Sequence, residues 1–220
     1  DATAGLPLDV FFMASASVPA SVFESPRRAL TTGDLEALLR RRRVIGLAEM
    51  MNFPGVVGGA PEELAKLELA THVDGHAPGV LGRSLNAYAA AGIGSDHEAY
   101  TAEEGRERLR AGMWLLIREA TAARNLEALL PLLAEYGPLR IAFCTDDREP
   151  EHIAADGHIN AMVRDAVAFG IPPEDALACA TLSPALWHGL RDFGAVAPGY
   201  RADLLLLPDL ERFVPDVVLK

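Results

Sequence analysis

The chain alternates short apolar runs with longer amphipathic segments along most of its 220 residues. Each run is too short for a helix and lies beside Gly or Pro, which is typical of buried strands. The runs cover residues 10–16, 44–50, 69–75, 90–96, 113–119 and 140–146. Strands that alternate with helices run parallel, so the pattern predicts an α/β fold. Both a doubly wound sheet and a (β/α)8 barrel satisfy it.

The segments between the runs carry recognisable helix ends. Thr101 and Glu104 have the spacing of a capping box, and Gly112 is placed to end the same helix. Two later amphipathic segments are predicted to stop at Gly137 and Gly170.

Composition limits the kind of ligand. Half of the residues are hydrophobic and 23% are charged, with a net charge of -11. Such a chain has no basic field for nucleic acid or an anionic membrane, so a small-molecule substrate is expected. The basic run Arg40–Arg43 is interpreted as a solvated helix end, where cations complement the helix dipole.

Cys144 and Cys179 lie far apart in apolar segments. This placement favours reduced core thiols of a cytoplasmic protein over a disulfide framework.

Polar residues lie at or just past the C-terminal ends of four predicted strands. They are Glu49, His76, His97 with its neighbour Glu98, and Asp146. In a barrel the carboxyl ends of the strands converge on one mouth, where such enzymes carry out their chemistry. Imidazoles and carboxylates together form a ligand set suited to Zn, Mn or Fe. Taken singly, each residue also has a structural interpretation: a histidine satisfied within the fold, or a surface charge at a strand end.

Five ordered blocks carry a family resemblance: "GLAEMMNFPGVVGG", "DGHAPGVLGRSLNAYAAAGIGSDHEAY", "LIREATAARNLEALLPLL", "CTDDREP" and "DGHINAMVRDAV". The chain resembles the bacterial adenine deaminases, a branch of the amidohydrolase superfamily. The tail "LSPALWHGLRDFGAVAPGYRADLLLL" is similar to the segment by which amidohydrolase chains leave the barrel for a small β-domain.

The resemblance implies an incomplete TIM barrel. Residues 1–190 would supply strands three to eight of the (β/α)8 barrel, and residues 191–220 would return into a small β-sandwich domain. The His-x-His pair that the superfamily carries on its first strand does not occur in this sequence. The chain is therefore expected to be a fragment, with weak or no activity alone and homo-oligomeric association through open strand edges.

The resemblance also implies a binuclear site of divalent metal, with Mn or Fe ahead of Zn. Glu49 matches the bridging carboxylate, His76 and His97 match metal-ligating histidines, and Asp146 matches an aspartate that touches metal and transfers protons. Hydroxide would attack C6 of adenine, and ammonia would leave to give hypoxanthine, as in purine salvage. Glu98 would protonate or orient a ring nitrogen.

Other residues match family-like blocks without a secure role and are candidates for substrate binding: Arg118, Glu119, Asn125, Asp147 and His158. Asp147 has an alternative as a helix cap or a partner of Arg148, and His158 as a first-turn helix residue. His72, His152 and His188 lie outside the motifs and are interpreted as structural.

Three functions are compatible with these patterns. The first is adenine deaminase. The second is another amidohydrolase that acts on a cyclic amide or a different amino-heterocycle, since substrate choice depends on loops. The third is a non-catalytic barrel relative, retained as a scaffold.

Overall fold

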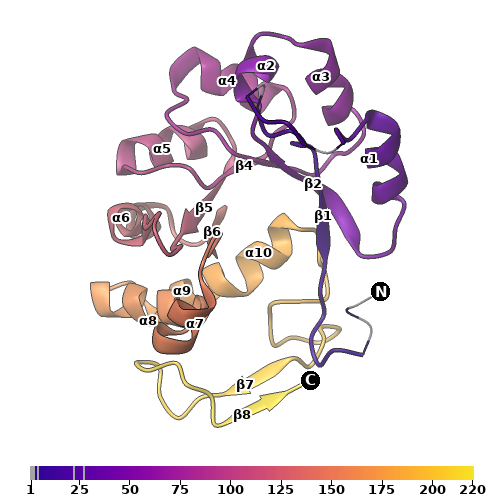
Figure 1. Ribbon diagram of the computed structural model, residues 1–220. Coiled ribbons are helices and arrows are strands. Elements are labelled where there is room, and N and C mark those ends of the chain that lie inside the picture. Colours follow the sequence, from indigo (N-terminus) through magenta and orange to yellow (C-terminus); the bar gives the residue numbers. More distant parts are fainter. Residues whose placement is uncertain (1–2, 4, 22, 27) are drawn as a thin grey trace. The chain divides into compact units, whose positions relative to one another are not determined.

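The computed structural model describes residues 3, 5–21, 23–26 and 28–220 (Figure 1). The chain forms two compact units. The first extends through Glu98 and also includes Glu107–Met113, and the second consists of Ala99–Arg106 and Trp114–Lys220. Neither unit coincides with residues 1–190 or with residues 191–220. The domain boundary predicted at residue 190 therefore stays a prediction.

The first unit alternates strands and helices. Its elements are β1 (Phe12–Ser15), α1 (Thr32–Leu39), β2 (Val44–Met50), α2 (Phe53–Val57), α3 (Pro61–Leu67), β3 (Val73–Gly75), α4 (Gly82–Ala90) and β4 (Ser95–Asp96). Helix α5 (Ala102–Arg110) is divided between the two units.

The strands of the first unit are parallel, as the alternating pattern predicts. β2 pairs with β1 on one side and with β3 on the other. α1 packs against β1 and β2, and α2 packs against α3 and α4. Buried apolar side chains fill the space under these helices, among them Leu35, Leu47, Met50, Leu85 and Ile93.

The second unit repeats this arrangement. Its elements are β5 (Trp114–Arg118), α6 (Leu126–Tyr136), β6 (Ile141–Cys144), α7 (Pro150–Asp156), α8 (Ile159–Phe169), α9 (Pro173–Ala180), α10 (Leu182–Trp187), β7 (Leu204–Leu206) and β8 (Val217–Leu219). β5 and β6 are parallel, and α8, α9 and α10 contact β6 (Figure 1). β7 and β8 form an antiparallel pair.

All six predicted strands exist, but two are much shorter than predicted. β3 begins at Val73 rather than residue 69, because Leu69 and Ala70 donate backbone hydrogen bonds to Lys66 and Leu67 at the end of α3. β4 covers Ser95–Asp96 rather than residues 90–96, because α4 continues to Ala90 and the chain then turns at Gly92 with φ 96°. In both places the apolar run begins where the preceding helix ends and the chain turns toward the strand.

The predicted helix ends are confirmed. The Thr101 hydroxyl accepts from the Glu104 backbone N–H (3.2 Å), while the Glu104 carboxylate accepts from the Thr101 N–H (3.1 Å). Helix α5 ends at Arg110, before Gly112. Gly137 and Gly170 are the C-caps of α6 and α8, each with positive φ.

Smaller expectations agree with the structure as well. Among the described residues, Cys144 and Cys179 form no disulfide; Cys144 is half-buried and Cys179 is buried, and burial raises the pKa of Cys179 to about 12. Arg40 caps the C-terminus of α1, so the basic run follows a helix end as interpreted. Among the described residues, no helix combines the length and the apolar character needed to cross a membrane.

A buried ion pair connects α5 to the strand ends of the first unit. The Arg108 Nε donates to the Asp96 carboxylate at 2.9 Å, and both side chains are 0% exposed. Two residues earlier on the same helix, Arg106 pairs with Glu103 and Glu135, whose side chains are 68% and 48% exposed. The ion pair of Arg108 is therefore expected to matter more for the free energy of unfolding than the ion pairs of Arg106.

We predict that Arg108→Met strongly destabilises the chain. Removing one partner of a buried ion pair leaves the other charge desolvated, which costs about 3–5 kcal/mol. The measurement is urea unfolding followed by circular dichroism. Arg106→Met is the matched control, and it should barely move the midpoint because exposed pairs contribute little. Equal midpoints for the two variants would contradict the assigned difference.

Candidate metal centre

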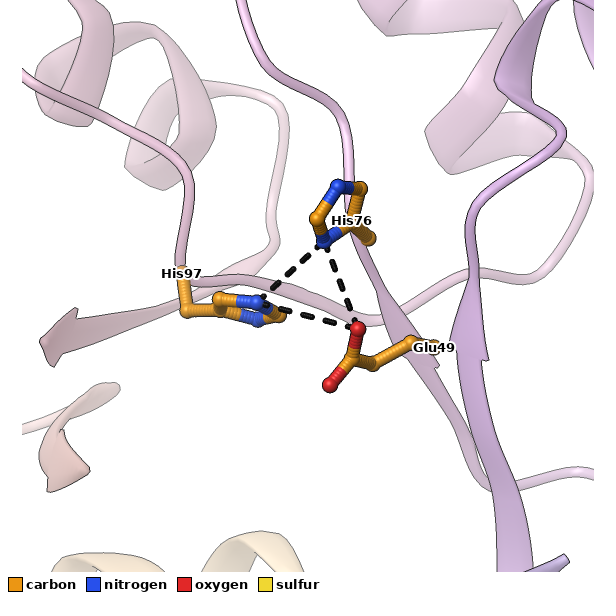
Figure 2. Close-up of side chains that lie close together, drawn as sticks. All are labelled: Glu49, His76 and His97. Atoms are coloured by element: carbon orange, nitrogen blue, oxygen red, sulfur yellow. Dashed lines mark hydrogen bonds and ion pairs between the residues drawn. The ribbon is translucent and has the colours of Figure 1, made fainter. Parts of the chain in front are cut away.

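The first unit brings together Glu49, His76 and His97 at its strand ends. Glu49 is the penultimate residue of β2, His76 directly follows β3, and His97 directly follows β4. Figure 2 shows the three side chains pointing toward one another from these separate elements. The sequence predicted this meeting, because parallel strands end at one edge of a sheet.

The facing atoms of the three residues are close enough to share one ion. His76 Nδ1 lies 3.3 Å from Glu49 Oε2 and 3.4 Å from His97 Nε2, and His97 Nε2 lies 3.9 Å from Glu49 Oε2. Two ligand atoms that each lie about 2.1 Å from an ion stand roughly 3.0 to 3.4 Å apart in neighbouring octahedral or tetrahedral positions. Two of the three separations fall in this range, and the third, between His97 Nε2 and Glu49 Oε2, is longer at 3.9 Å.

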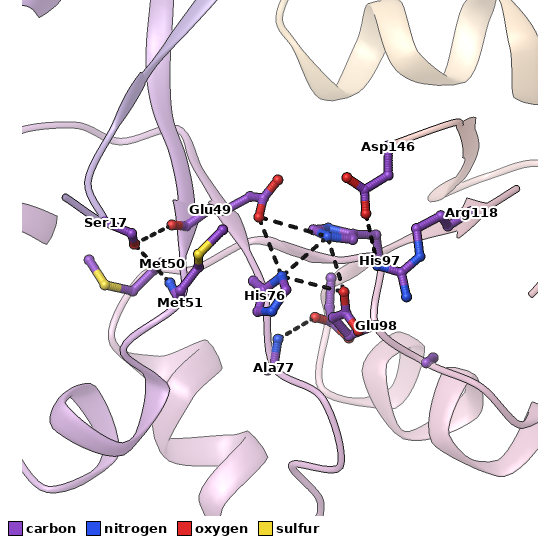
Figure 3. A network of polar contacts seen from close by, with 12 residues as sticks. Ser17, Glu49, Met50, Met51, His76, Ala77, His97, Glu98, Arg118 and Asp146 are labelled. Atoms are coloured by element: carbon purple, nitrogen blue, oxygen red, sulfur yellow. Dashed lines mark hydrogen bonds and ion pairs between the residues drawn. The ribbon is translucent and has the colours of Figure 1, made fainter. Parts of the chain in front are cut away.

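Glu98 adds a second carboxylate to the cluster. Its Oε1 lies 3.4 Å from His76 Nδ1 and 3.4 Å from His97 Nε2 (Figure 3). The Glu98 side chain is 7% exposed, so its charge faces these imidazoles rather than solvent. Two nitrogen and two carboxylate donors fit a divalent cation, and such a mixed set accepts Zn, Mn or Fe.

The carboxylates also change the acid–base behaviour of one ligand candidate. The pKa of His76 is raised above its ordinary value, chiefly by the hydrogen bond to Glu49, and burial opposes this rise. The negative charges of Glu98 and Asp96 raise it further. The cluster therefore stabilises positive charge at the position of the His76 ring.

The second unit contains a separate polar group around Asp146. The residue lies two positions after β6 with φ 50°, a left-handed conformation that Asp tolerates better than most residues. Its carboxylate accepts a hydrogen bond from Arg118 Nη1 at 2.8 Å (Figure 3). Arg118 is 4% exposed and also donates to the Tyr100 hydroxyl at 3.3 Å.

The remaining substrate-binding candidates make structural contacts within the second unit. Glu119 accepts from the Leu126 N–H at the start of α6 (3.3 Å), and burial raises its pKa. Asn125 is buried and donates to the Ala99 carbonyl at 2.9 Å.

The structure also bears on the alternatives for Asp147 and His158. The backbone carbonyl of Asp147 accepts a hydrogen bond from the Thr121 N–H (3.1 Å), and Asp147 is exposed. Glu149, not Asp147, is the N-cap residue of α7. His158 is the N-cap residue of α8 and hydrogen-bonds Thr145 (3.1 Å), which matches its first-turn alternative.

Sequence reasoning did not single out the polar residues behind the ligand candidates: Ser17, Tyr88, Asp96 and Arg108. Arg108 lies in the strongly charged segment "AEEGRERLR", which is typical of a solvated helix. Asp96 directly precedes His97, and this adjacency was the one available signal.

The fold and the cluster define an α/β chain with a candidate metal centre at the ends of parallel strands. The Amidohydrolase family matches this chain over residues 1–220. The chain belongs to the amidohydrolase family, and this membership places it among hydrolases.

Curated relatives share nearly the whole sequence. The chain is 48% identical over 98% of its length to the adenine deaminase of Desulfatibacillum aliphaticivorans, and 47% identical over 100% to that of Syntrophobacter fumaroxidans. It spans 39% and 38% of those two proteins. The crystal structure of an amidohydrolase aligns with this chain at a TM-score of 0.54 and 17% sequence identity. The alignment covers 73% of this chain and 47% of the amidohydrolase chain. That likeness supports the amidohydrolase fold.

We predict that, with a chelator present, His76 stays protonated to higher pH than free histidine. Because its pKa is raised on folding, this protonation stabilises the fold below the unfolded pKa of about 6.5, and the gain is lost as pH rises through the folded value. Glu49→Gln should lower the pKa of His76, since it removes the principal cause.

The measurement is a pH titration of the histidine ring signals by NMR. His158 serves as an internal reference, because burial shifts its pKa in the opposite direction. A pKa for His76 at or below that of His158 would contradict the electrostatics of the cluster.

Proposed function

We propose that this chain is part of a metal-dependent adenine deaminase, which converts adenine and water to hypoxanthine and ammonia. The observation that carries the proposal is identity of 47–48%, over 97% of the chain or more, to relatives named adenine deaminase. The donor set of the first unit supports the same chemistry, because hydrolytic deamination needs an activated water.

Glu49, His76 and His97 would hold a divalent cation, since their donor atoms face one another within 4.8 Å. A cation bound there supplies Lewis acidity, which lowers the pKa of a water molecule toward neutrality. We propose Mn or Fe as the metal, with Zn as the alternative, in a binuclear site. Asp146 is proposed as a further metal ligand on its match to the adenine deaminase motif "CTDD". The remaining steps belong to side chains of the protein.

Asp146 is proposed to move the proton. In hydrolytic deamination a C–O bond forms at C6 of adenine, the C6–N bond breaks, and the departing amine needs a proton. Arg118 orients the Asp146 carboxylate through its 2.8 Å hydrogen bond. An aspartate held in one direction by a buried arginine is a suitable proton carrier between water and the leaving amine.

Glu98 is proposed to orient or protonate a ring nitrogen of adenine. Its low exposure and its position next to both imidazoles keep the carboxyl group at the reacting centre. Glu119, Asn125, Asp147 and His158 stay candidates for substrate binding, and their contacts within the second unit give them a structural role as well.

We also propose that residues 1–190 are barrel and residues 191–220 belong to a small β-sandwich domain. The support is the change from parallel pairing in β5 and β6 to antiparallel pairing in β7 and β8. Antiparallel hairpins are the units from which sandwiches are built.

We predict that Asp146→Asn abolishes most adenine deamination. Loss of a proton-transferring side chain typically costs about 10²- to 10⁴-fold in rate. The measurement is ammonia release from adenine with Mn or Fe supplied, on the chain joined to the coding sequence that flanks it in its gene. Glu151→Gln, which changes an exposed carboxylate at the start of α7, is the matched control and should keep the wild-type rate.

The same assay separates the alternatives. Hydantoins, as cyclic amides, and amino-heterocycles other than adenine are tested beside it. Ring opening of the hydantoins is followed by loss of substrate, because it releases no ammonia, and bound metal is quantified. Turnover of another substrate but not of adenine would replace the proposed function with a different amidohydrolase activity. Inactivity on the whole panel, without bound metal, would favour a scaffold.

A further inference from the structure

Buried polar groups join the strand ends that carry the ligand candidates. The Tyr88 hydroxyl, on α4, donates to the Met50 carbonyl at 2.6 Å and accepts from the His76 backbone N–H at 2.9 Å. Tyr88 is 0% exposed. One hydroxyl therefore ties the residue after Glu49 to the backbone of His76.

A second connection joins the His76 and His97 segments. The Asp96 carboxylate accepts from the Ala77 N–H at 2.8 Å, and Arg108 Nη2 donates to the Ala77 carbonyl at 2.8 Å. Asp96 and Arg108 complete the circuit through their 2.9 Å ion pair. The residue after His76 is thus held on both of its backbone groups by the residue before His97 and its partner.

Ser17 holds the remaining ligand segment. Its hydroxyl donates to the Glu49 carbonyl at 2.7 Å and accepts from the Met51 N–H at 3.0 Å (Figure 3). Backbone groups at or beside Glu49 and His76 are therefore fixed by side chains outside the ligand set, and the Asp96 side chain ties the residue before His97 to the same network.

Core stability alone does not require this network. A buried ion pair replaced by well-packed apolar residues often leaves stability unchanged or higher, so such pairs are weak contributors to net stability. What the hydrogen bonds provide is direction, because each fixes a particular peptide group. Outer partners of metal ligands act in this way, and their loss typically weakens metal affinity about 10- to 100-fold.

We propose that Tyr88, Asp96, Arg108 and Ser17 are positioning residues that set the relative placement of Glu49, His76 and His97 for a divalent cation. They touch no ligand side chain in the network described above. They act on the backbone from which those side chains project. The inference rests on the proposed metal site and concerns the geometry of that site rather than the identity of the substrate.

The test is a Co²⁺ titration of the chain, with the visible absorption of the bound ion as the readout. Its intensity reports coordination geometry as well as affinity. Tyr88→Phe removes only the hydroxyl, so the ring still fills its place in the core. It should weaken Co²⁺ binding about 10-fold or more and change the spectrum. Ser17→Ala, at a half-buried position, should act in the same direction.

Thr31→Ala is the control for a general loss of stability. Thr31 forms the capping box of α1 with Asp34, so its removal weakens the same unit without touching a ligand segment. Its affinity and spectrum should equal those of the wild-type chain.

Three results would overturn the inference. If the Tyr88→Phe and Ser17→Ala variants bind Co²⁺ with wild-type affinity and spectrum, the positioning role is refuted. The proposed metal site is unaffected by that result. A Thr31→Ala variant that loses affinity as Tyr88→Phe does would show that the effect is general destabilisation. A wild-type chain that binds no Co²⁺ would refute the metal site and the inference together.

Discussion

The close approach of β3 to β4 is the constraint on which the ligand cluster depends. Gly75 ends β3, and a Cβ at that position would lie 2.2 Å from the Ser95 backbone oxygen. Only a residue without a side chain lets the two strand ends approach so closely. His76 follows one strand and His97 follows the other, so this contact brings the two imidazoles together, and the pairing of β2 with β3 brings the Glu49 carboxylate to them. The Tyr88 ring packs against the same glycine, which places its hydroxyl between β2 and β3.

Charge explains why such a cluster is tolerated. Glu49 and Glu98 bring negative charge to one place, and a cation bound between them and the imidazoles would relieve that repulsion. Asp96 differs from these two carboxylates, because it is fully buried and forms an ion pair with Arg108. The unit thus separates the carboxylates that face the imidazoles from the Asp96 carboxylate, which pairs with Arg108 and accepts from the Ala77 backbone N–H. In the second unit, the charged Asp146 follows the strand β6, and the buried Arg118 gives its carboxylate a partner and a direction.

Local patterns predicted more of the fold than of the site. The six strands, their parallel direction in the pairs β1–β2, β2–β3 and β5–β6, and the helix ends at Gly137 and Gly170 follow from periodicity and capping chemistry. The predicted lengths of β3 and β4 were wrong, because hydrophobicity does not distinguish the end of a helix and the turn after it from the start of a strand. Arg106 and Arg108 show the limit for charges: they stand on one helix two residues apart, yet one is paired near the surface and the other is fully buried. Their sequence neighbourhood is the same, and only long-range packing separates them.

The sequence by itself determined the α/β class, the family resemblance that the comparisons confirm, and the strand-end positions of Glu49, His76, His97 and Asp146. These follow from residue order, since each motif is local to one strand and the loop after it. The tertiary structure decided which polar residues support them. Tyr88, Asp96, Arg108 and Ser17 reach the ligand segments across 12 to 38 positions of sequence. Contacts of that kind exist only once the strands have paired and the helices have packed, because no local pattern specifies which distant backbone group a buried side chain will meet.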